Sequence, residues 1–353
     1  MHLSGCHSLN NVQLSQCSMI AIASIGIVAN ALVLYALVAA NAREAKKRVV
    51  NWLIINQNFL DLCCCVVLVI TLSLRVSNIY LTGMLGYVLC GIFISANATY
   101  CVLNAAVINL MTLTVERYLK VVYPFWSKKH LKKWMIYAAI VFSWVGGILS
   151  VGPLGMATSF VFEGTCMGFK IYFDTPKIRK GYGIWNFFSF SLIPLLIFVY
   201  CYAHIVVVMR KQMRVMAGHN MEGSAQRASH SQAQSKRVKW NVIKTMIIVS
   251  AFFVSCWYPM NLYIIVMEDP LLTSERTIGY IATVFLPYIN ISVNPFIYGT
   301  KHEGVRRILA DMMICYKRDN ATVSNSRGPF PGSSSGSTGD SIKNKNKSTA
   351  VHK

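Results

Sequence analysis

Two acidic side chains lie inside long apolar stretches of this sequence, which is an unfavourable place for a charged group. Asp61 lies near the middle of the second stretch, and Glu116 lies near the end of the third. A carboxylate at membrane depth is costly and needs a cation, water or other polar partners. Glu116 is followed by Arg117 and Tyr118, so a cation lies next to it. We expect Asp61 to be functional, and Glu116 to be either an interfacial anchor or part of a switch.

Prolines interrupt several of the apolar stretches. They are Pro153, Pro194, Pro259 and Pro295. Each removes one backbone hydrogen bond and kinks its helix, and taken alone this favours a static bend. Two of the prolines lie beside bulky and polar side chains, in Cys256-Trp257-Tyr258-Pro259 and Asn294-Pro295-Phe296-Ile297-Tyr298. These two segments are candidates for repacking between two states.

Composition indicates what must surround these residues. The chain has 353 residues, of which 54% are hydrophobic and only 13% are charged, whereas soluble domains carry about 25% charged residues. Seven apolar stretches are long enough to cross a hydrocarbon core of about 30 Å. They are approximately 17–40, 49–74, 88–119, 134–157, 184–209, 240–266 and 277–299. The sequence therefore predicts an all-α membrane protein, a seven-transmembrane helix bundle over 17–299.

The basic residues predict the orientation of this bundle. With the N-terminal tail 1–16 outside the cell, 28 of the 34 Lys and Arg residues lie on the cytoplasmic side, as the positive-inside rule requires. The tail has no charged side chain to oppose its export, so the first stretch is expected to be a signal anchor in the plasma membrane. Because the basic residues border a membrane face, they do not indicate nucleic-acid binding. They reflect topology alone, or contact with anionic lipid and an acidic cytosolic partner.

The chain after the last stretch divides into two parts. An amphipathic juxtamembrane helix is expected over 300–316, because apolar residues recur at helical spacing with arginines on another face. The apolar residues are Val305, Ile308, Leu309, Met312 and Met313. Cys315 is placed for palmitoylation, although an ordinary apolar cysteine fits equally well. The Ser- and Gly-rich segment 317–353 is expected to be a disordered cytoplasmic tail.

Two cysteines fall on the oxidising outer side in this topology. Cys90 begins the third stretch and Cys166 lies in the second outer loop, so we expect a disulfide between them. Cys6 and Cys17 are a weaker candidate pair. Around Glu163-Gly164-Thr165 the loop alternates aromatic and branched residues, which predicts a β-hairpin whose second arm the disulfide would hold over the bundle.

Taken together, these residues resemble the rhodopsin-like family of G-protein-coupled receptors over residues 15–316. Landmarks of that family occur in order, one set per stretch. They are Gly26 and Asn30; Asp61; Glu116-Arg117-Tyr118; Trp144; Pro194 and Tyr202; Cys256-Trp257-Tyr258-Pro259; and Asn294-Pro295-Phe296-Ile297-Tyr298. A single tripeptide would be weak evidence, but seven sets in register are specific.

The resemblance implies a mechanism. A ligand enters an outer cavity, Trp257 and Phe253 repack around Pro259, and the inner half of the sixth helix swings outward. Arg117 then leaves Glu116, Tyr202 and Tyr298 turn inward, and a heterotrimeric G protein exchanges nucleotide. The implied switch residues are Glu116, Arg117, Tyr118, Tyr202, Phe253, Trp257, Pro259, Asn294, Pro295 and Tyr298. Arrestin, receptor kinases and membrane lipid are the other implied partners, and no cofactor is implied except an allosteric sodium ion.

Three departures from the family pattern carry predictions. Cys90 and Arg117 are 27 residues apart, where the family usually has 25, so an irregularity is expected in the outer half of the third helix. Family members that bind sodium beside the aspartate corresponding to Asp61 often use a third-helix serine as well, and this chain has Ala106 at that position. Asn290 and Asn294 would have to replace the missing hydroxyl as sodium ligands. The acidic partner that some members place before the sixth-helix proline is Lys239, which predicts some activity without ligand.

The family comparison also restricts the ligand. Amine receptors place an aspartate where this chain has Thr99, or Asn97 if the register shifts, so amines are disfavoured. Opsins place the retinal-binding lysine where this chain has Tyr288, which excludes a Schiff base. The second outer loop, with its hairpin and the basic residues that follow it, resembles the corresponding loop of peptide receptors of the family, neuropeptide receptors among them. The candidate ligand contacts are Asn97, Thr99, Asn186, Trp257, Asn261 and Tyr288; a lipid or a small polar ligand is the alternative.

Other classes of membrane protein have less support in the sequence. A transporter would usually show paired halves with interrupted helices, and a channel a selectivity ring. The enzyme motifs HExxH and GxSxG are both missing, since His302-Glu303 lacks a second histidine. We therefore expect a receptor rather than an enzyme, with a transporter as the remaining alternative.

Overall fold

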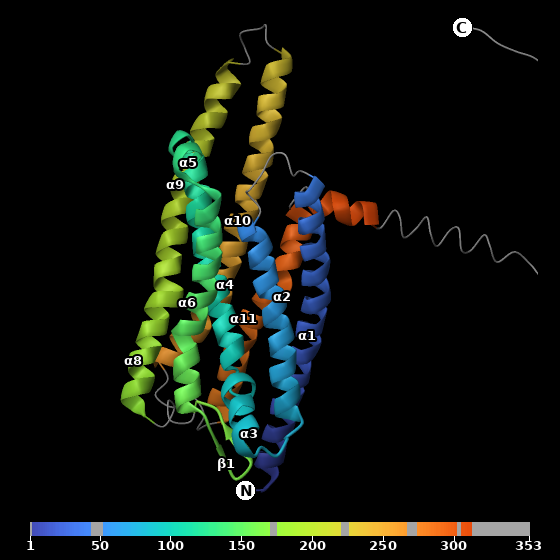
Figure 1. The fold of residues 1–353 in the computed structure, drawn as a ribbon, viewed down its shortest axis with the longest axis vertical. Helices are drawn as coiled ribbons and strands as arrows, with labels where there is room; N and C mark the ends of the chain where they lie inside the picture. Colours follow the sequence, from blue (N-terminus) through green and yellow to red (C-terminus); the bar gives the residue numbers. More distant parts are fainter. Residues whose placement is uncertain are drawn as a thin grey trace, which may run out of the picture. The chain divides into compact units, whose positions relative to one another are not determined.

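The computed structural model describes residues 2–43, 52–169, 175–219, 226–266, 274–301 and 305–312. The chain divides into two units, Met1–Ala310 and Asp311–Lys353, and the fold below belongs to the first. Seven long helices build it: α1 (His2–Arg43), α2 (Trp52–Val76), α4 (Asn97–Val122), α6 (Lys133–Thr158), α9 (Ile193–His219), α10 (Gln226–Val266) and α11 (Ser274–Lys301). Helix α4 packs against α2, α6 and α9, and α11 packs against α1 and α10 (Figure 1). The central position of α4 lets it connect most of the other helices.

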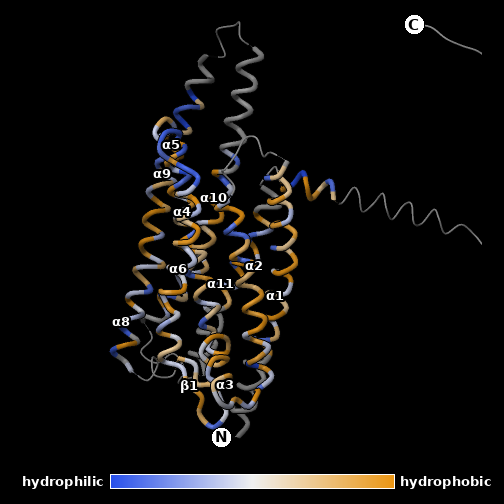
Figure 2. The backbone as a smooth tube through the Cα atoms, viewed as in Figure 1, coloured by the Kyte–Doolittle hydropathy of each residue, from blue (hydrophilic) through white to orange (hydrophobic). Residues whose placement is uncertain are grey.

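The described helices have the length and composition of membrane spans. Six segments qualify: Leu14–Ala42, Trp52–Val76, Gly83–Val122, Lys133–Thr158, Lys180–Arg214 and Ile243–Tyr263. The seventh predicted span, 277–299, lies within α11. Figure 2 shows apolar residues along α1 and α6 and hydrophilic residues gathered at the short helix α5 (Pro124–His130). The predicted seven-helix membrane fold is confirmed.

One boundary and one proline differ from the sequence-based expectation. Helix α1 begins at His2, so the helix continues into the segment 1–16 that was expected to be a separate tail. Helix α11 contains Pro287 as well as the predicted Pro295. An α-helix tolerates proline at membrane depth when neighbouring helices satisfy the freed carbonyl, so neither proline ends α11.

The third transmembrane segment is broken near its outer half, as the count of residues predicted. It consists of α3 (Gly83–Leu89), a π-helical turn η1 (Cys90–Ile94) and then α4. Between η1 and α4, Ala96 has a left-handed backbone with φ of 65°, which only surrounding contacts can maintain in a residue other than glycine. One such contact is the hydrogen bond from Arg75 Nε to the Ile94 carbonyl at 2.7 Å.

A β-hairpin lies beside this broken segment. Strands β1 (Phe160–Phe162) and β2 (Thr165–Met167) pair antiparallel, with Val161 opposite Cys166. The turn uses Glu163 and Gly164, both with positive φ, as a two-residue hairpin turn requires. Cys166 forms the predicted disulfide with Cys90, with the two Cα atoms 5.3 Å apart. The hairpin is therefore attached to the third segment, and we call this side of the bundle the disulfide end.

The weaker disulfide candidate is not formed. Cys17 is an exposed free cysteine. Both Cys6 and Cys17 belong to the single helix α1, where eleven residues separate two positions by about 16 Å along the axis. Because a disulfide needs Cα atoms within about 7 Å, this helical arrangement does not allow the Cys6–Cys17 pair, which the sequence had left open.

The short helix after α11 agrees with the predicted periodicity. Within the helical residues 305–312, Val305 is fully buried and Ile308 is 5% exposed, and both join the hydrophobic core. Arg306 and Arg307 are exposed on the other face. Cys315 lies outside the described residues, so palmitoylation there stays a prediction.

Helices α4 and α6 approach each other closely through glycine. A Cβ atom added at Gly147 would lie 2.6 Å from the Ala105 side chain, whereas one added at Gly152 would find its nearest neighbours at 3.6 Å. Small residues let membrane helices pack backbone against backbone. Gly147 is therefore a contact point that fixes the α4–α6 distance.

We predict that Gly147→Ala lowers the thermal unfolding temperature of the detergent-solubilised protein, because overpacking of this kind costs about 1–3 kcal/mol. Gly152→Ala is the matched control on the same helix and should leave the unfolding temperature nearly unchanged. Equal unfolding temperatures for the two variants would contradict the close approach at Gly147.

Candidate functional site

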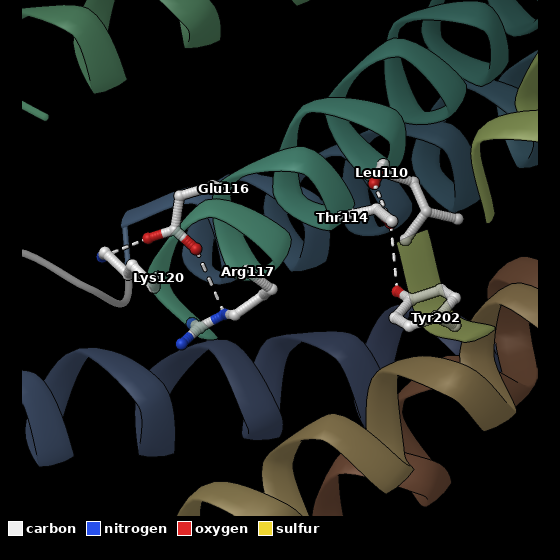
Figure 3. Close-up of polar contacts among 6 residues, drawn as sticks. All are labelled: Leu110, Thr114, Glu116, Arg117, Lys120 and Tyr202. Carbon is white, nitrogen blue, oxygen red and sulfur yellow. Dashed lines mark hydrogen bonds and ion pairs between the residues drawn. The ribbon is translucent and has the colours of Figure 1, made fainter. Parts of the chain in front are cut away.

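The end of α4 remote from the disulfide carries a cluster of charges. Glu116 is 4% exposed, and its Oε2 lies 3.3 Å from Arg117 Nε. Its other oxygen, Oε1, pairs with Lys120 one helical turn further on, as Figure 3 shows. The predicted Glu116–Arg117 pair is thus present. Lys120 was not singled out, although its spacing of four residues from Glu116 is the usual signal of such a pair.

Tyr202 connects three helices near this charge cluster. Its hydroxyl lies 3.0 Å from Thr114 Oγ1 on α4 and accepts a hydrogen bond from Ser250 Oγ on α10 at 3.2 Å. Thr114 donates its proton to the Leu110 carbonyl at 2.8 Å (Figure 3), so Tyr202 must be the donor to Thr114. Tyr202 was predicted as a switch residue, but Thr114 and Ser250 were not. Nothing in the sequence says which hydroxyls meet across three helices.

Tyr118 lies on α4, one turn beyond Thr114, and faces α9, the helix that carries Tyr202. Its hydroxyl lies 3.2 Å from His204 Nδ1 on α9, and the two rings are 5.6 Å apart. All three residues of the motif Glu116-Arg117-Tyr118 therefore have polar contacts, and Tyr118 reaches a second helix, α9.

A small internal cavity surrounds Asp61 in the middle of the bundle. Its lining comes from α2, α4, α10 and α11: Gln57, Asp61, Leu103, Ala106, Leu110, Val249, Phe253, Trp257, Asn290, Ile291 and Asn294. Asp61 is 1% exposed. Its Oδ2 accepts a hydrogen bond from Asn294 Nδ2 at 2.9 Å, and its Oδ1 accepts one from Gln57 Nε2 at 3.5 Å. The carboxylate predicted to be functional thus meets the predicted switch residues Phe253, Trp257 and Asn294 at one cavity.

The size and polar atoms of this cavity limit what it can hold. It offers about 10 Å³ for the centre of a water molecule, which is close to the minimum for one water. The Oδ1 atoms of Asn290 and Asn294 are buried and have no hydrogen-bond partner among the described residues. Together with Asp61 they provide oxygen atoms of the kind that bind small hard cations. The cavity fits one water or one small ion, and not an organic ligand.

Aromatic contacts connect the cavity to α9. The Phe253 and Trp257 rings are 5.5 Å apart, and Phe253 meets Phe198 edge to face at 6.1 Å. Pro259 lies inside α10 two residues beyond Trp257. The structure therefore places the predicted repacking residues Phe253, Trp257 and Pro259 on one continuous part of α10.

The predicted ligand contacts are less closely grouped than the switch residues. Thr99 is fully buried, and its hydroxyl has no partner in the described part of the chain. Asn97 donates to the Gly152 carbonyl on α6 at 3.1 Å, so its amide faces another helix. Asn261 donates to the Trp257 carbonyl at 3.1 Å. Of the six candidates only Trp257 lines the cavity, and their role in binding stays a prediction.

The remaining predicted contacts and switch residues complete this account. Asn186 is half-buried in α8 (Pro176–Phe187), and Tyr288 is buried in α11. Pro295 is buried within α11. The side chains of Tyr298 and Lys239 lie outside the described residues, so the predictions that depend on them are unchanged.

Comparison with known proteins identifies similar chains. Residues 29–298 match the family model described as 7 transmembrane receptor (rhodopsin family). Melanin-concentrating hormone receptor 1 of Rattus norvegicus is 23% identical over 312 residues, covering 86% of this chain and 82% of that receptor. Somatostatin receptor type 5 of Rattus norvegicus is 29% identical over 220 residues, covering 59% and 54%. The crystal structure of squid rhodopsin has a TM-score of 0.68 at 17% identity, covering 91% and 93%, which shows a shared fold.

The hydrogen bonds of Tyr202 lead to a stability prediction. Tyr202→Phe removes the donor to Thr114 and the acceptor of Ser250, both of which are buried, so it should cost about 1–3 kcal/mol and lower the thermal unfolding temperature. Tyr35 on α1 is 60% exposed, and Tyr35→Phe serves as the control that should change little. A Tyr202→Phe protein as stable as the wild type would argue against this three-helix contact.

Proposed function

Because this chain belongs to the rhodopsin family of seven-transmembrane receptors, we propose that it binds an extracellular ligand and activates a heterotrimeric G protein, acting as a receptor and not as an enzyme. The family match carries this proposal, since residues 29–298 contain every predicted switch residue. The location follows from the same reading of the chain. It is a multi-pass protein of the plasma membrane with its N-terminus outside the cell.

A peptide is the ligand class that the comparisons favour. Two of the similar receptors are named for melanin-concentrating hormone and somatostatin, which are both peptide hormones. The hairpin attached through Cys90 and Cys166 supports this choice, because it lies at the proposed ligand side and exposes Glu163 of its turn. A lipid or a small polar molecule is the second candidate, supported by the buried hydroxyl of Thr99, which has no hydrogen-bond partner in the described part of the chain.

The proposed activation mechanism uses two sets of contacts, one around the cavity beside Asp61 and one at the charge cluster of Glu116. The Glu116–Arg117 ion pair is closed, which corresponds to the resting arrangement. A ligand shifts such a two-state bundle only by the difference between its affinities for the two states. Repacking of Phe253 and Trp257 around Pro259 would move the inner half of α10, break the Tyr202–Ser250 contact and free Arg117. The G protein then binds in the opened crevice, with arrestin and receptor kinases following and membrane lipid surrounding the bundle.

A sodium ion is a further proposed ligand, at the cavity beside Asp61. The unpartnered oxygens of Asn290 and Asn294 replace the hydroxyl that Ala106 lacks. Asp61, Asn290 and Asn294 would hold the ion, which would supply positive charge to the buried carboxylate. An ion that binds the resting arrangement better would stabilise it by mass action.

The proposed role of Arg117 is tested by Arg117→Ala. We expect nucleotide exchange to fall to background across a panel of purified G proteins, because the crevice loses the cation that the ion pair releases. The thermal unfolding temperature of the variant is measured alongside, and exchange is compared per folded receptor, so that a loss of fold is told apart from a loss of coupling. Undiminished exchange by this variant would show that Arg117 has no such role.

The sodium proposal predicts a salt-specific effect. Replacing choline chloride by sodium chloride at equal ionic strength should raise the unfolding temperature of the wild type and lower its exchange without ligand. Asp61→Asn should abolish both responses, while Glu163→Gln, which alters an exposed carboxylate of the hairpin turn, should retain them. A sodium response that survives Asp61→Asn would place the ion elsewhere.

A further inference from the structure

A continuous chain of side-chain hydrogen bonds runs across the bundle to Asp61. It begins on α6, where Trp144 Nε1 donates to Asn56 Oδ1 at 3.1 Å. Asn56 Nδ2 on α2 then donates to Asn109 Oδ1 on α4 at 2.9 Å. Asn109 Nδ2 returns to α2, donating to Gln57 Oε1 at 2.8 Å. Three amides and one indole thus connect α2, α4 and α6.

The chain ends at the cavity described above. Gln57 Nε2 donates to Asp61 Oδ1 at 3.5 Å, and Asp61 Oδ2 accepts from Asn294 Nδ2 on α11 at 2.9 Å. The bond from Gln57 is the longest of the five, so it is the one that tightens or breaks with the smallest movement. We call Trp144, Asn56, Asn109, Gln57, Asp61 and Asn294 the polar relay.

The direction of every bond in the polar relay is fixed by its chemistry. The indole of Trp144 can only donate, and an ionised carboxylate can only accept. Between these two ends each amide has one possible orientation, with its oxygen toward Trp144 and its nitrogen toward Asp61. Asn109 Nδ2 also donates to the Leu53 carbonyl at 3.0 Å, which confirms the orientation independently. The aligned dipoles therefore present an N–H group to the carboxylate.

Burial makes each link of the relay matter. Asn109 is 0%, Asp61 1%, Gln57 3% and Asn56 7% exposed. In an environment of low dielectric, consecutive hydrogen bonds strengthen one another, and a member that loses its partner is costly. Removal of one link is therefore felt at Asp61 even when the altered side chain does not touch it.

We propose that Gln57 is a positioning residue of the activation switch, which holds the Asp61 carboxylate toward Asn294 and thereby stabilises the resting arrangement of the bundle. The proposal rests on the receptor function given above and concerns the regulation of the same site. Asn294 immediately precedes Pro295 in α11, and Phe253 and Trp257 of α10 line the same cavity. Asp61 is thus the point at which the polar relay meets α10 and α11, the helices that must move in the proposed mechanism.

The relay members differ in what they can do. Asn56, Asn109 and Trp144 lie outside the cavity, and their contacts join α2, α4 and α6. Gln57 is the member of this group that lines the cavity and reaches the carboxylate. A side chain of equal length without the amide would fill the same space and leave Asp61 with the Asn294 bond. Position 57 therefore separates the positioning role from packing.

The test compares Gln57→Met, which keeps length and removes the amide, with Asn104→Leu. Asn104 is a buried amide of α4 that donates to Ser150 Oγ at 2.9 Å and belongs to no link of the relay. Nucleotide exchange without ligand, per folded receptor, should rise at least about twofold for Gln57→Met, the lower limit expected for residues coupled through one network. It should stay at the wild-type level for Asn104→Leu.

Trp144→Phe gives a second test from the far end of the relay. It keeps the ring that contacts Phe59 and removes the indole N–H. We expect a smaller rise in exchange, and no further rise when Trp144→Phe is added to Gln57→Met, because the link is already broken. Distant independent sites would instead combine additively. If Gln57→Met does not fold, Trp144→Phe alone decides, and an unchanged or lower exchange rate overturns the proposal.

Failure of the relay can be told apart from failure of the receptor function. Unfolding temperatures of wild type, Gln57→Met, Asp61→Asn and the double variant form a mutant cycle that needs no G protein. A wild type inert toward every G protein would refute the proposed function, and the cycle would still report on the relay. Additive unfolding temperatures, or equal exchange for Gln57→Met and the wild type, would overturn the role assigned to Gln57.

Discussion

The low dielectric of the bilayer is the constraint on which this structure depends, because a polar side chain inside it must find its partner on another helix. Asn30 shows the consequence for α1. Its Nδ2 donates to the Ile291 carbonyl of α11 at 3.2 Å and to Gly26 at 2.9 Å, while its Oδ1 accepts from Asn58 of α2 at 3.0 Å. One buried amide thus fixes how three helices face one another. Apolar side chains pack against lipid tails as well as against another helix, so apolar contacts alone would not fix this arrangement.

The same constraint bears on the proposed switch at the other end of the bundle. The ionic contacts of Glu116 are made to Arg117 and Lys120, which belong to its own helix α4. A neutral hydrogen bond from Ser250 to Tyr202 joins α10 to α9 near this level. Movement of α10 away from α9 would break this bond. The polar contacts deeper in the bundle, at Asp61 and Asn30, do not depend on it.

Sequence reasoning reached most of the elements and only part of their contacts. The seven spans and the hairpin follow from composition and local pattern, because each depends on residues close together in the chain. The Cys90–Cys166 bridge joins residues 76 positions apart and was found because the charge distribution placed both cysteines on the same side of the membrane. The polar relay was missed, since Gln57 and Asn109 carry no signal until two helices face each other. For the same reason Thr114 and Ser250 were not linked with Tyr202, and Asn97 was considered for the ligand although its amide faces α6.

The broken third segment shows how a bundle absorbs a change in length without losing its site. Cys90 is held by the disulfide, and Arg117 must remain at the level of Tyr202, so any extra residues have to be accommodated between these two positions. They are accommodated at η1 and Ala96, next to the disulfide. Below this point α4 is regular from Asn97 to Val122, which keeps Leu103, Ala106 and Leu110 on the cavity face. The irregularity therefore changes the disulfide end, where the ligand is proposed to bind, and preserves the register around Asp61, where the switch is proposed to lie.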